Sequence, residues 1–113
     1  MENCLFCRII SGEIPSKKAY EDEQALAFYD IDPKSPVHVL IVPKKHIASI
    51  AVAAEEDFSL VAHLMKVAQQ LAGELKLDNG FRIVINTGKD GGQTVDHLHV
   101  HLLGGRAMGW PPG

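Results

Sequence analysis

The sequence predicts an α+β fold, in which a five-stranded antiparallel sheet packs against one long and one short helix. Apolar residues recur every three or four positions over residues 57–75, which is the period of an amphipathic helix. Five other segments are short and bounded by turn or break residues, as strands are. With 113 residues, 46% of them hydrophobic, the chain has the size and the apolar content of a single domain over residues 1–113.

In the first half of the chain, residues 4–10 predict a short helix, which Gly12 ends. Two strands follow around the acidic turn of residues 21–23. A loop with two prolines then leads to an apolar strand that ends at Pro43. The strands expected here cover residues 18–21, 25–30 and 37–42.

In the second half, the long helix ends at the turn Asp78-Asn79-Gly80. A strand over residues 81–86 leads into a glycine-rich loop over residues 87–92. The last predicted strand covers residues 97–103 and ends at Gly104-Gly105.

Composition restricts the partners. The net charge of −3 argues against nucleic acid and against an acidic membrane surface, although backbone N–H groups could still hold a small phosphate ligand. The first residues lack the basic and apolar regions of a signal peptide, and no apolar segment is long enough to span a bilayer. We therefore expect a cytoplasmic protein with no membrane partner.

The most informative feature is the run His97-Leu98-His99-Val100-His101. On a strand, the three histidines project from one face and the apolar residues from the other. Imidazole can act as base, acid, nucleophile or metal ligand near neutral pH, so the run predicts a chemical site. The alternative is a surface strand whose histidines are accidental.

A loop that could hold phosphate comes just before this run. Its glycines over residues 88–92 expose backbone N–H donors, and Gln93 and Thr94 add side-chain donors. Beside the histidines we interpret the loop as a phosphate site. Taken alone, it could equally be a hairpin connection.

Several segments together resemble the histidine triad (HIT) superfamily, and specifically its nucleotide-binding (Hint) branch. Residues 97–103 match the signature His-φ-His-φ-His-φ-φ, in which φ is apolar. The similarity extends over nearly the whole chain, through residues 28–33, 38–46, 90–95 and the ending Trp110-Pro111-Pro112-Gly113.

The resemblance implies a HIT-like fold and a homodimer that hydrolyses the P–N bond of purine nucleoside phosphoramidates. It implies that His99 attacks the phosphorus and forms a nucleotidyl-histidine, with no cofactor required. His101 would donate to a phosphate oxygen, while His38 and His97 would complete a histidine network. Taken alone, His38 could be an ordinary core histidine.

The resemblance also implies a substrate site. Asp30 would bind the ribose hydroxyls, and Trp110 would lie near the leaving group, reaching from the partner subunit. Phosphate would contact Asn86, Gln93 and Thr94, and the base would occupy an apolar slot of Ile9, Ile14, Phe28 and Ile31. Each apolar residue alone could be ordinary core, and Trp110 could simply anchor the tail.

Some relatives hold a structural zinc ion with residues at the positions of Cys4, Cys7, His46 and His97, which is an acceptable tetrahedral set. A bound zinc would remove His97 from acid–base work. The alternative is that the cysteines are two small buried hydrophobic residues.

Three other functions remain open. The chain could be a dinucleoside polyphosphate hydrolase or nucleotidyl transferase of the same superfamily, although the Trp-Pro-Pro-Gly ending argues against both. It could be a nucleotide-binding scaffold whose slow hydrolysis is incidental. It could also be a metal-binding protein in which every histidine is a ligand.

Overall fold

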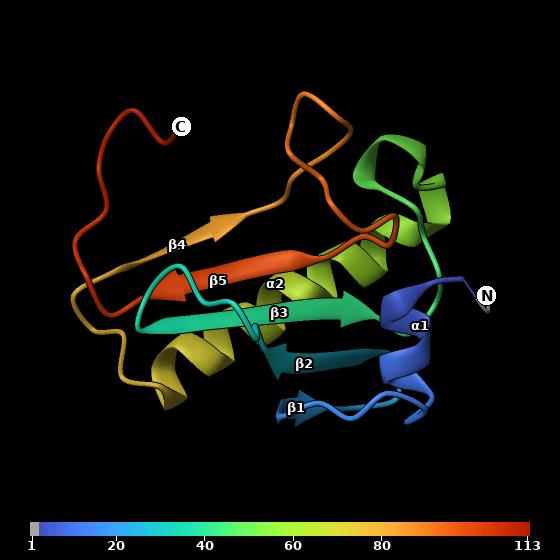
Figure 1. Ribbon diagram of the computed structural model, residues 1–113, viewed down its shortest axis with the longest axis horizontal. Coiled ribbons are helices and arrows are strands. Elements are labelled where there is room, and N and C mark those ends of the chain that lie inside the picture. The colour runs from blue at the N-terminus through green and yellow to red at the C-terminus, as the bar shows by residue number, and fades with distance from the viewer. Residues whose placement is uncertain (1–2) are drawn as a thin grey trace.

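Five antiparallel strands form one sheet in the order β1-β2-β3-β5-β4 in the computed structural model, which describes residues 3–113 (Figure 1). The predicted α+β fold is confirmed, with one short helix, one long helix and two 3-10 turns, Ile50–Val52 and Glu55–Asp57. The helices are α1 (Leu5–Ile10) and α2 (Phe58–Glu74). The strands are β1 (Lys18–Glu21), β2 (Ala25–Tyr29), β3 (Val37–Pro43), β4 (Phe81–Val84) and β5 (Val100–Gly104).

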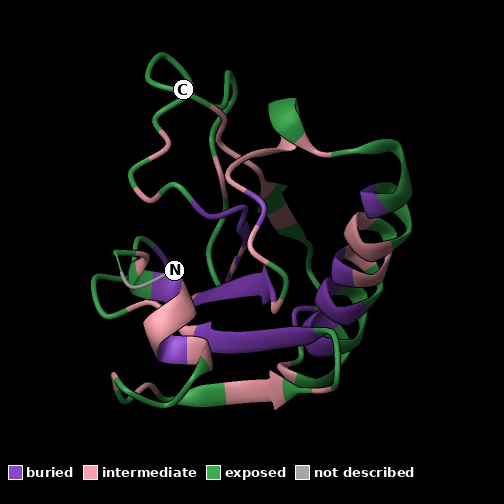
Figure 2. Ribbon diagram, turned by 90° about the vertical axis from the view of Figure 1, so that its right-hand side faces the viewer, coloured by how far each residue is buried: buried purple, intermediate pink, exposed green. Residues whose placement is uncertain are grey.

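The main core lies between the sheet and α2. Leu64, Val67 and Leu71 recur on one face of α2, because three- and four-residue steps return to the same side of a helix. They pack in one buried cluster with Val39 and Leu102 of the sheet. Figure 2 shows the buried strands between the two helices, with α2 on one side of the sheet and α1 on the other.

The other face of the sheet is only partly covered. Phe6 and Ile9 of α1 pack with Leu26, Phe28, Leu40 and Val42 in a second, smaller buried cluster. Strand residues alternate between faces, so His38 lies on the same face as Leu40, and His101 is the cross-strand partner of Leu40. The histidines therefore lie beside α1, on the opposite side of the sheet from α2.

The element boundaries differ from the predictions at several ends. The third strand extends one residue further, to Pro43, the second and fourth strands end earlier, at Tyr29 and Val84, and the long helix is one residue shorter at each end. Within the described part of the chain, no helix is both long and apolar enough to cross a membrane.

The prediction that the histidine strand begins at residue 97 is wrong, because β5 begins at Val100. Val100 and its partner Ile41 are the last pair of the ladder between β5 and β3. Before Val100 the chain bonds differently: the Leu98 N–H donates to the Ile47 carbonyl at 2.6 Å. The predicted alternation of faces nevertheless holds. Leu98, Val100 and Leu102 are all buried in the core beneath α2.

Candidate active site

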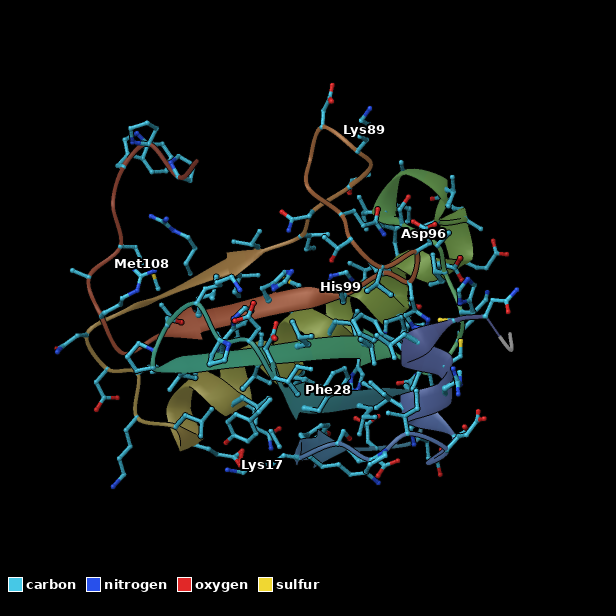
Figure 3. The ribbon with its side chains drawn as sticks, viewed as in Figure 1. Lys17, Phe28, Lys89, Asp96, His99 and Met108 are labelled. Carbon is cyan, nitrogen blue, oxygen red and sulfur yellow. The ribbon has the colours of Figure 1, made fainter. Side chains whose placement is uncertain are left out.

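His99 lies where the chain enters β5, above Phe28 of β2 in the view of Figure 3. Its Nδ1–H donates to the carbonyl of His97 at 2.7 Å. A neutral imidazole that donates from Nδ1 carries its lone pair on Nε2. His99 is 4% exposed and forms part of the wall of a cavity, so a neutral imidazole with a fixed tautomer adjoins a space that a ligand can fill.

Three groups beside His99 form a directed chain of hydrogen bonds. The backbone N–H of Lys34 donates to Nδ1 of His38 at 3.0 Å, so the proton of neutral His38 is on Nε2. That Nε2–H donates to Nδ1 of His101 at 2.9 Å. His101 must therefore carry its own proton on Nε2, which is buried and has no partner among the described residues. A buried donor without an acceptor needs an explanation, and a ligand in the cavities that His101 lines would supply that acceptor.

Burial keeps this chain of imidazoles neutral. It lowers the pKa of His101 to about 4, and the neighbouring rings of His99 and His38 act in the same direction. Burial is also the largest cause that lowers the pKa of His38, although Asp30 opposes it. At neutral pH, His101 therefore donates from Nε2 as an uncharged ring.

We expect this burial to make the free energy of unfolding pH-dependent. The pKa of His101 falls from 6.5 to about 4 on folding, so the unfolded chain binds a proton that the folded chain refuses. The contribution of neutral His101 to the free energy of unfolding is therefore fully present above pH 6.5 and is lost as the pH falls toward 4. Urea unfolding of wild type and of His101→Gln at several pH values isolates this contribution. Identical pH dependence in the two proteins would show that His101 is not responsible.

The cavity beside His99 has a volume of about 520 Å³ and lies between α1, β2 and the residues just before the histidine run. Four residues predicted for the base slot form part of its wall: Ile9, Ile14, Phe28 and Ile31. Ile31 is fully exposed, so at least one member of the slot is not ordinary core. Apolar walls with a few polar groups are typical of sites for small ligands.

A second cavity of about 470 Å³ adjoins the first, and Asp30, Thr94 and His101 contribute to both. Asn86 lines this second cavity together with His38. Asp30 is held at the junction, because its Oδ1 accepts the backbone N–H of Asp32 at 2.8 Å and its Oδ2 lies 3.5 Å from Nε2 of His38. A ligand that fills both cavities would pass over the histidines.

Two cysteines and two histidines meet at one end of this face. One ligand atom from each of Cys4, Cys7, His46 and His97 lies within 4.8 Å of the others. Nδ1 of His97 is 3.3 Å from Sγ of Cys4 and 3.1 Å from Nδ1 of His46, which is itself 3.3 Å from Sγ of Cys7. Ligand atoms around a tetrahedral zinc ion are separated by about 3.3 to 3.8 Å, so these distances fit zinc.

The surroundings of this cluster also fit a cation. Nε2 of His97 bonds to the carbonyl of Pro43 at 2.9 Å, so Nε2 carries the proton and the Nδ1 lone pair faces the sulfur atoms. Burial, and then the neighbouring Cys4 thiol, raise the pKa of Cys7 to about 11. A coordinated zinc ion would reverse this effect, since it deprotonates the thiols that bind it.

A family model described as the HIT domain matches residues 11–108. The chain belongs to the HIT family.

Relatives in this family resemble the chain over almost its whole length. An uncharacterized HIT-like protein from Synechocystis is 48% identical, over 99% of this chain and 98% of its own. A HIT family hydrolase from Legionella pneumophila is 51% identical, with a TM-score of 0.96, and the alignment covers 98% of this chain and 100% of that one. A histidine triad nucleotide-binding protein from Candida albicans is 36% identical, with a TM-score of 0.82, over 96% and 83% of the two chains.

Two residues predicted for the HIT substrate site do not reach either cavity. The Gln93 amide bonds to backbone groups, since its Nε2 donates to the carbonyls of Val95 and of Ala48, which lies in the segment after β3, and its Oε1 accepts the N–H of Gly88. Both of its N–H donors are therefore used by backbone carbonyls, and its phosphate contact stays a prediction. Trp110 is 84% exposed in the C-terminal tail, which lies at the opposite end of the sheet from α1 (Figure 1). Its predicted contact from a partner subunit stays a prediction.

The backbone conformation of the loop over residues 87–92 requires glycine at three positions. A Cβ on Gly91 would lie 2.2 Å from the carbonyl oxygen of Thr87, which is too close for any other residue. Gly88 and Gly92 have φ values of 72° and 80°, in the left-handed region that favours glycine. Figure 3 shows the tip of this loop, at Lys89, projecting away from the sheet.

Three groups important to the site were not predicted. They are the ring of Phe6, which packs against His99, the N–H of Lys34 and the carbonyl of Pro43. The backbone groups give no signal in a sequence. Phe6 did give a signal in the sequence, because it is an aromatic residue between the two cysteines, on the side of the predicted helix that is buried.

Proposed function

We propose that this HIT family protein hydrolyses the P–N bond of purine nucleoside 5′-phosphoramidates through a nucleotidyl intermediate on His99. The observation that carries the proposal is the single tautomer of His99, fixed by the bond from Nδ1 to the His97 carbonyl, with the ring on a cavity wall. The names of two relatives, a HIT family hydrolase and a histidine triad nucleotide-binding protein, support the coarser part of the proposal, which is a hydrolase that binds nucleotides.

In the first step, the Nε2 lone pair of His99 attacks the α-phosphorus and a P–Nε2 bond forms. The P–N bond to the amine breaks, and its electron pair leaves with the amine nitrogen, which takes a proton from solvent. The ring becomes positively charged, and the His97 carbonyl stabilises that charge through the Nδ1–H. One difficult displacement is thereby divided into two easier ones.

In the second step, water attacks the same phosphorus and the P–Nε2 bond breaks. Its electron pair returns to His99, which becomes neutral again, and the water gives one proton to solvent. The products are the amine and a nucleoside monophosphate. The Nε2–H of His101 donates to a phosphate oxygen in both steps, because this donor has no hydrogen-bond partner among the described residues and His101 lines both cavities.

The substrate lies across the two cavities. The base occupies the apolar slot that contains Phe28, and the carboxylate of Asp30 accepts hydrogen bonds from the ribose hydroxyls. The phosphate lies where the cavities meet, beside Thr94 and Asn86. An apolar slot of this kind accepts the large flat surface of a purine.

A homodimer is part of the proposal. β4 is the last strand of the sheet order and carries two exposed apolar side chains, Phe81 and Ile83. An edge strand with an apolar surface is suited to pairing with another chain. The exposed Trp110 would then be free to approach the leaving group of the partner's substrate.

A zinc ion held by Cys4, Cys7, His46 and His97 would have four protein ligands and no open position. When bound, it would supply structure and no Lewis-acid chemistry at the substrate. The ion would connect α1 to the segment that precedes β5.

The direct test compares the turnover of an adenosine phosphoramidate with that of a diadenosine polyphosphate. We expect the phosphoramidate to have the higher kcat/KM, because the Trp110-Pro111-Pro112-Gly113 ending argues against a polyphosphate hydrolase. A higher kcat/KM for the diadenosine compound would favour the polyphosphate hydrolase instead. Binding of adenosine monophosphate without turnover of either compound would favour a nucleotide-binding scaffold.

A further inference from the structure

We propose that Phe6 is a positioning residue for His99, and that it transmits the state of the four-residue cluster to the nucleophilic ring. The cluster is Cys4, Cys7, His46 and His97, as defined above. The inference rests on the proposed nucleophilic role of His99. It assigns a function to a residue that touches the reacting ring and contributes no polar group.

Phe6 and His101 hold the His99 ring from two sides. The Phe6 and His99 centroids are 5.0 Å apart with an interplanar angle of 86°, and the His99 and His101 centroids are 5.0 Å apart at 62°. The hydrogen bond from Nδ1 fixes one nitrogen but leaves the ring free to tilt about that bond. Edge-to-face contacts on two sides restrict this tilt and hold Nε2 in one direction.

Phe6 is itself held by the cluster. It belongs to α1, whose six residues are too few to form a stable helix alone. Cys4 caps this helix, since its Sγ accepts the Cys7 N–H at 3.2 Å, and both thiols contact Nδ1 of His97. Because Phe6 lies between the two cysteines and is only 4% exposed, loss of the cluster contacts would displace its ring.

His97 provides a second connection between the same two sites. Its Nδ1 faces the thiols, its Nε2 bonds to the Pro43 carbonyl, and its own carbonyl accepts the proton of His99. Its ring also meets Phe6, at a centroid distance of 6.0 Å and an angle of 73°. The cluster is therefore connected to His99 in two ways, through the Phe6 side chain and through the backbone carbonyl of His97.

The simpler interpretation is that Phe6 is only a wall of the base slot. It lines the same cavity as Phe28, and the two rings meet edge to face at 5.5 Å. The two functions differ in what they change, because a wall residue determines binding, whereas a positioning residue determines the rate once substrate is bound. Phe28 belongs to the wall and makes no aromatic contact with His99 among the described residues, so it is the matched comparison.

The experiment compares Phe6→Leu and Phe28→Leu in metal-loaded protein. Rapid-quench single turnover at saturating adenosine phosphoramidate gives the rate of adduct formation, and calorimetry gives the Kd of adenosine monophosphate. We expect Phe6→Leu to slow the saturated rate by roughly tenfold to a hundredfold, as small misplacements of reacting groups do, with little change in Kd. Phe28→Leu should mainly raise Kd. A raised Kd with an unchanged saturated rate for Phe6→Leu would overturn the proposal.

Histidine ring ¹⁵N NMR provides a readout that does not require turnover. Wild type and Phe6→Leu should both show His99 as the Nδ1–H tautomer, because the His97 carbonyl fixes it, but the His99 ring signals of Phe6→Leu should be shifted and broadened as the ring tilts about that bond. His99 ring signals that are identical in position and width in the two proteins would contradict the proposal. Should wild type form no adduct, the proposed function fails, while the NMR comparison still tests whether Phe6 orients the ring. Phe6→Met is the second variant should the leucine protein not fold.

The link to the cluster is tested by combining changes. Groups that act through one network have non-additive effects. Removal of metal should slow adduct formation in wild type but cause little further loss in Phe6→Leu. Independent, multiplicative losses would show that Phe6 does not transmit the state of the cluster.

Discussion

Replacing His99 by alanine is expected to lower kcat for an adenosine phosphoramidate by roughly ten-thousandfold or more, as loss of a covalent nucleophile does. The reason is that no other described imidazole combines a carbonyl-bonded Nδ1 with a place on the wall of the base cavity. Steady-state kinetics measures the loss. Calorimetry with adenosine monophosphate should give a Kd close to that of wild type.

His101→Ala is the matched comparison. It removes a hydrogen-bond donor to phosphate and one of the two ring contacts to His99 but keeps the nucleophilic imidazole, so its loss should be about a hundredfold to a thousandfold, the usual effect of removing one such donor. Near-normal turnover in His99→Ala would exclude a covalent intermediate on that ring. Loss of adenosine monophosphate binding in His99→Ala would show that the lower kcat of this variant does not measure the loss of the nucleophile alone.

Replacing both Cys4 and Cys7 by serine is expected to remove one zinc ion per chain and to lower Tm by roughly 10 °C or more. The cluster joins α1 to His46 and His97, which lie in segments far away in the sequence. A metal that binds only the folded chain stabilises it by mass action. Elemental analysis of the purified protein and differential scanning calorimetry measure the two effects.

Serine is chosen because it keeps the other role of Cys4. The Cys4 side chain caps α1, and a serine hydroxyl is a good N-cap acceptor, so the loss of Tm would report the metal rather than the cap. Chelation of zinc from wild type should give a similar Tm, with no further change in the serine variant. Wild type that is purified without zinc, together with an unchanged Tm in the variant, would contradict the metal site.

The fold could be predicted because it depends on local patterns. The alternation of Leu98, Val100 and Leu102 with the histidines correctly identified which side chains enter the core. The start of β5 could not be predicted, since it depends on where the partner strand β3 stops bonding. A sequence shows the alternation of apolar and polar residues within a strand, but it does not show at which residue the partner strand stops pairing.

The candidate site was predicted where residue type determines the role. The resemblance to relatives that hold zinc indicated the set Cys4, Cys7, His46 and His97, which the fold does bring together. Gln93 was expected at phosphate because amides donate, but nearby backbone groups use both ends of its side chain. A sequence does not reveal such competition, since the competing carbonyls belong to Ala48 and Val95.

The tautomers of His38 and His101 show the same limit. They follow from one backbone N–H, that of Lys34, which donates to His38 and thereby directs both protons of the pair. Every residue has such an N–H, so its position carries information only after folding. The most consequential proton of the site, on Nε2 of His101, could not have been assigned from residue types.

Mass spectrometry of protein quenched during turnover of an adenosine phosphoramidate tests the central claim most directly. We expect a fraction of the chains to carry one adenylyl group, and fragmentation should locate it on His99. The adduct should disappear once the substrate is exhausted. An adduct on another residue, or steady turnover with no adduct at any quench time, would contradict nucleophilic attack by His99.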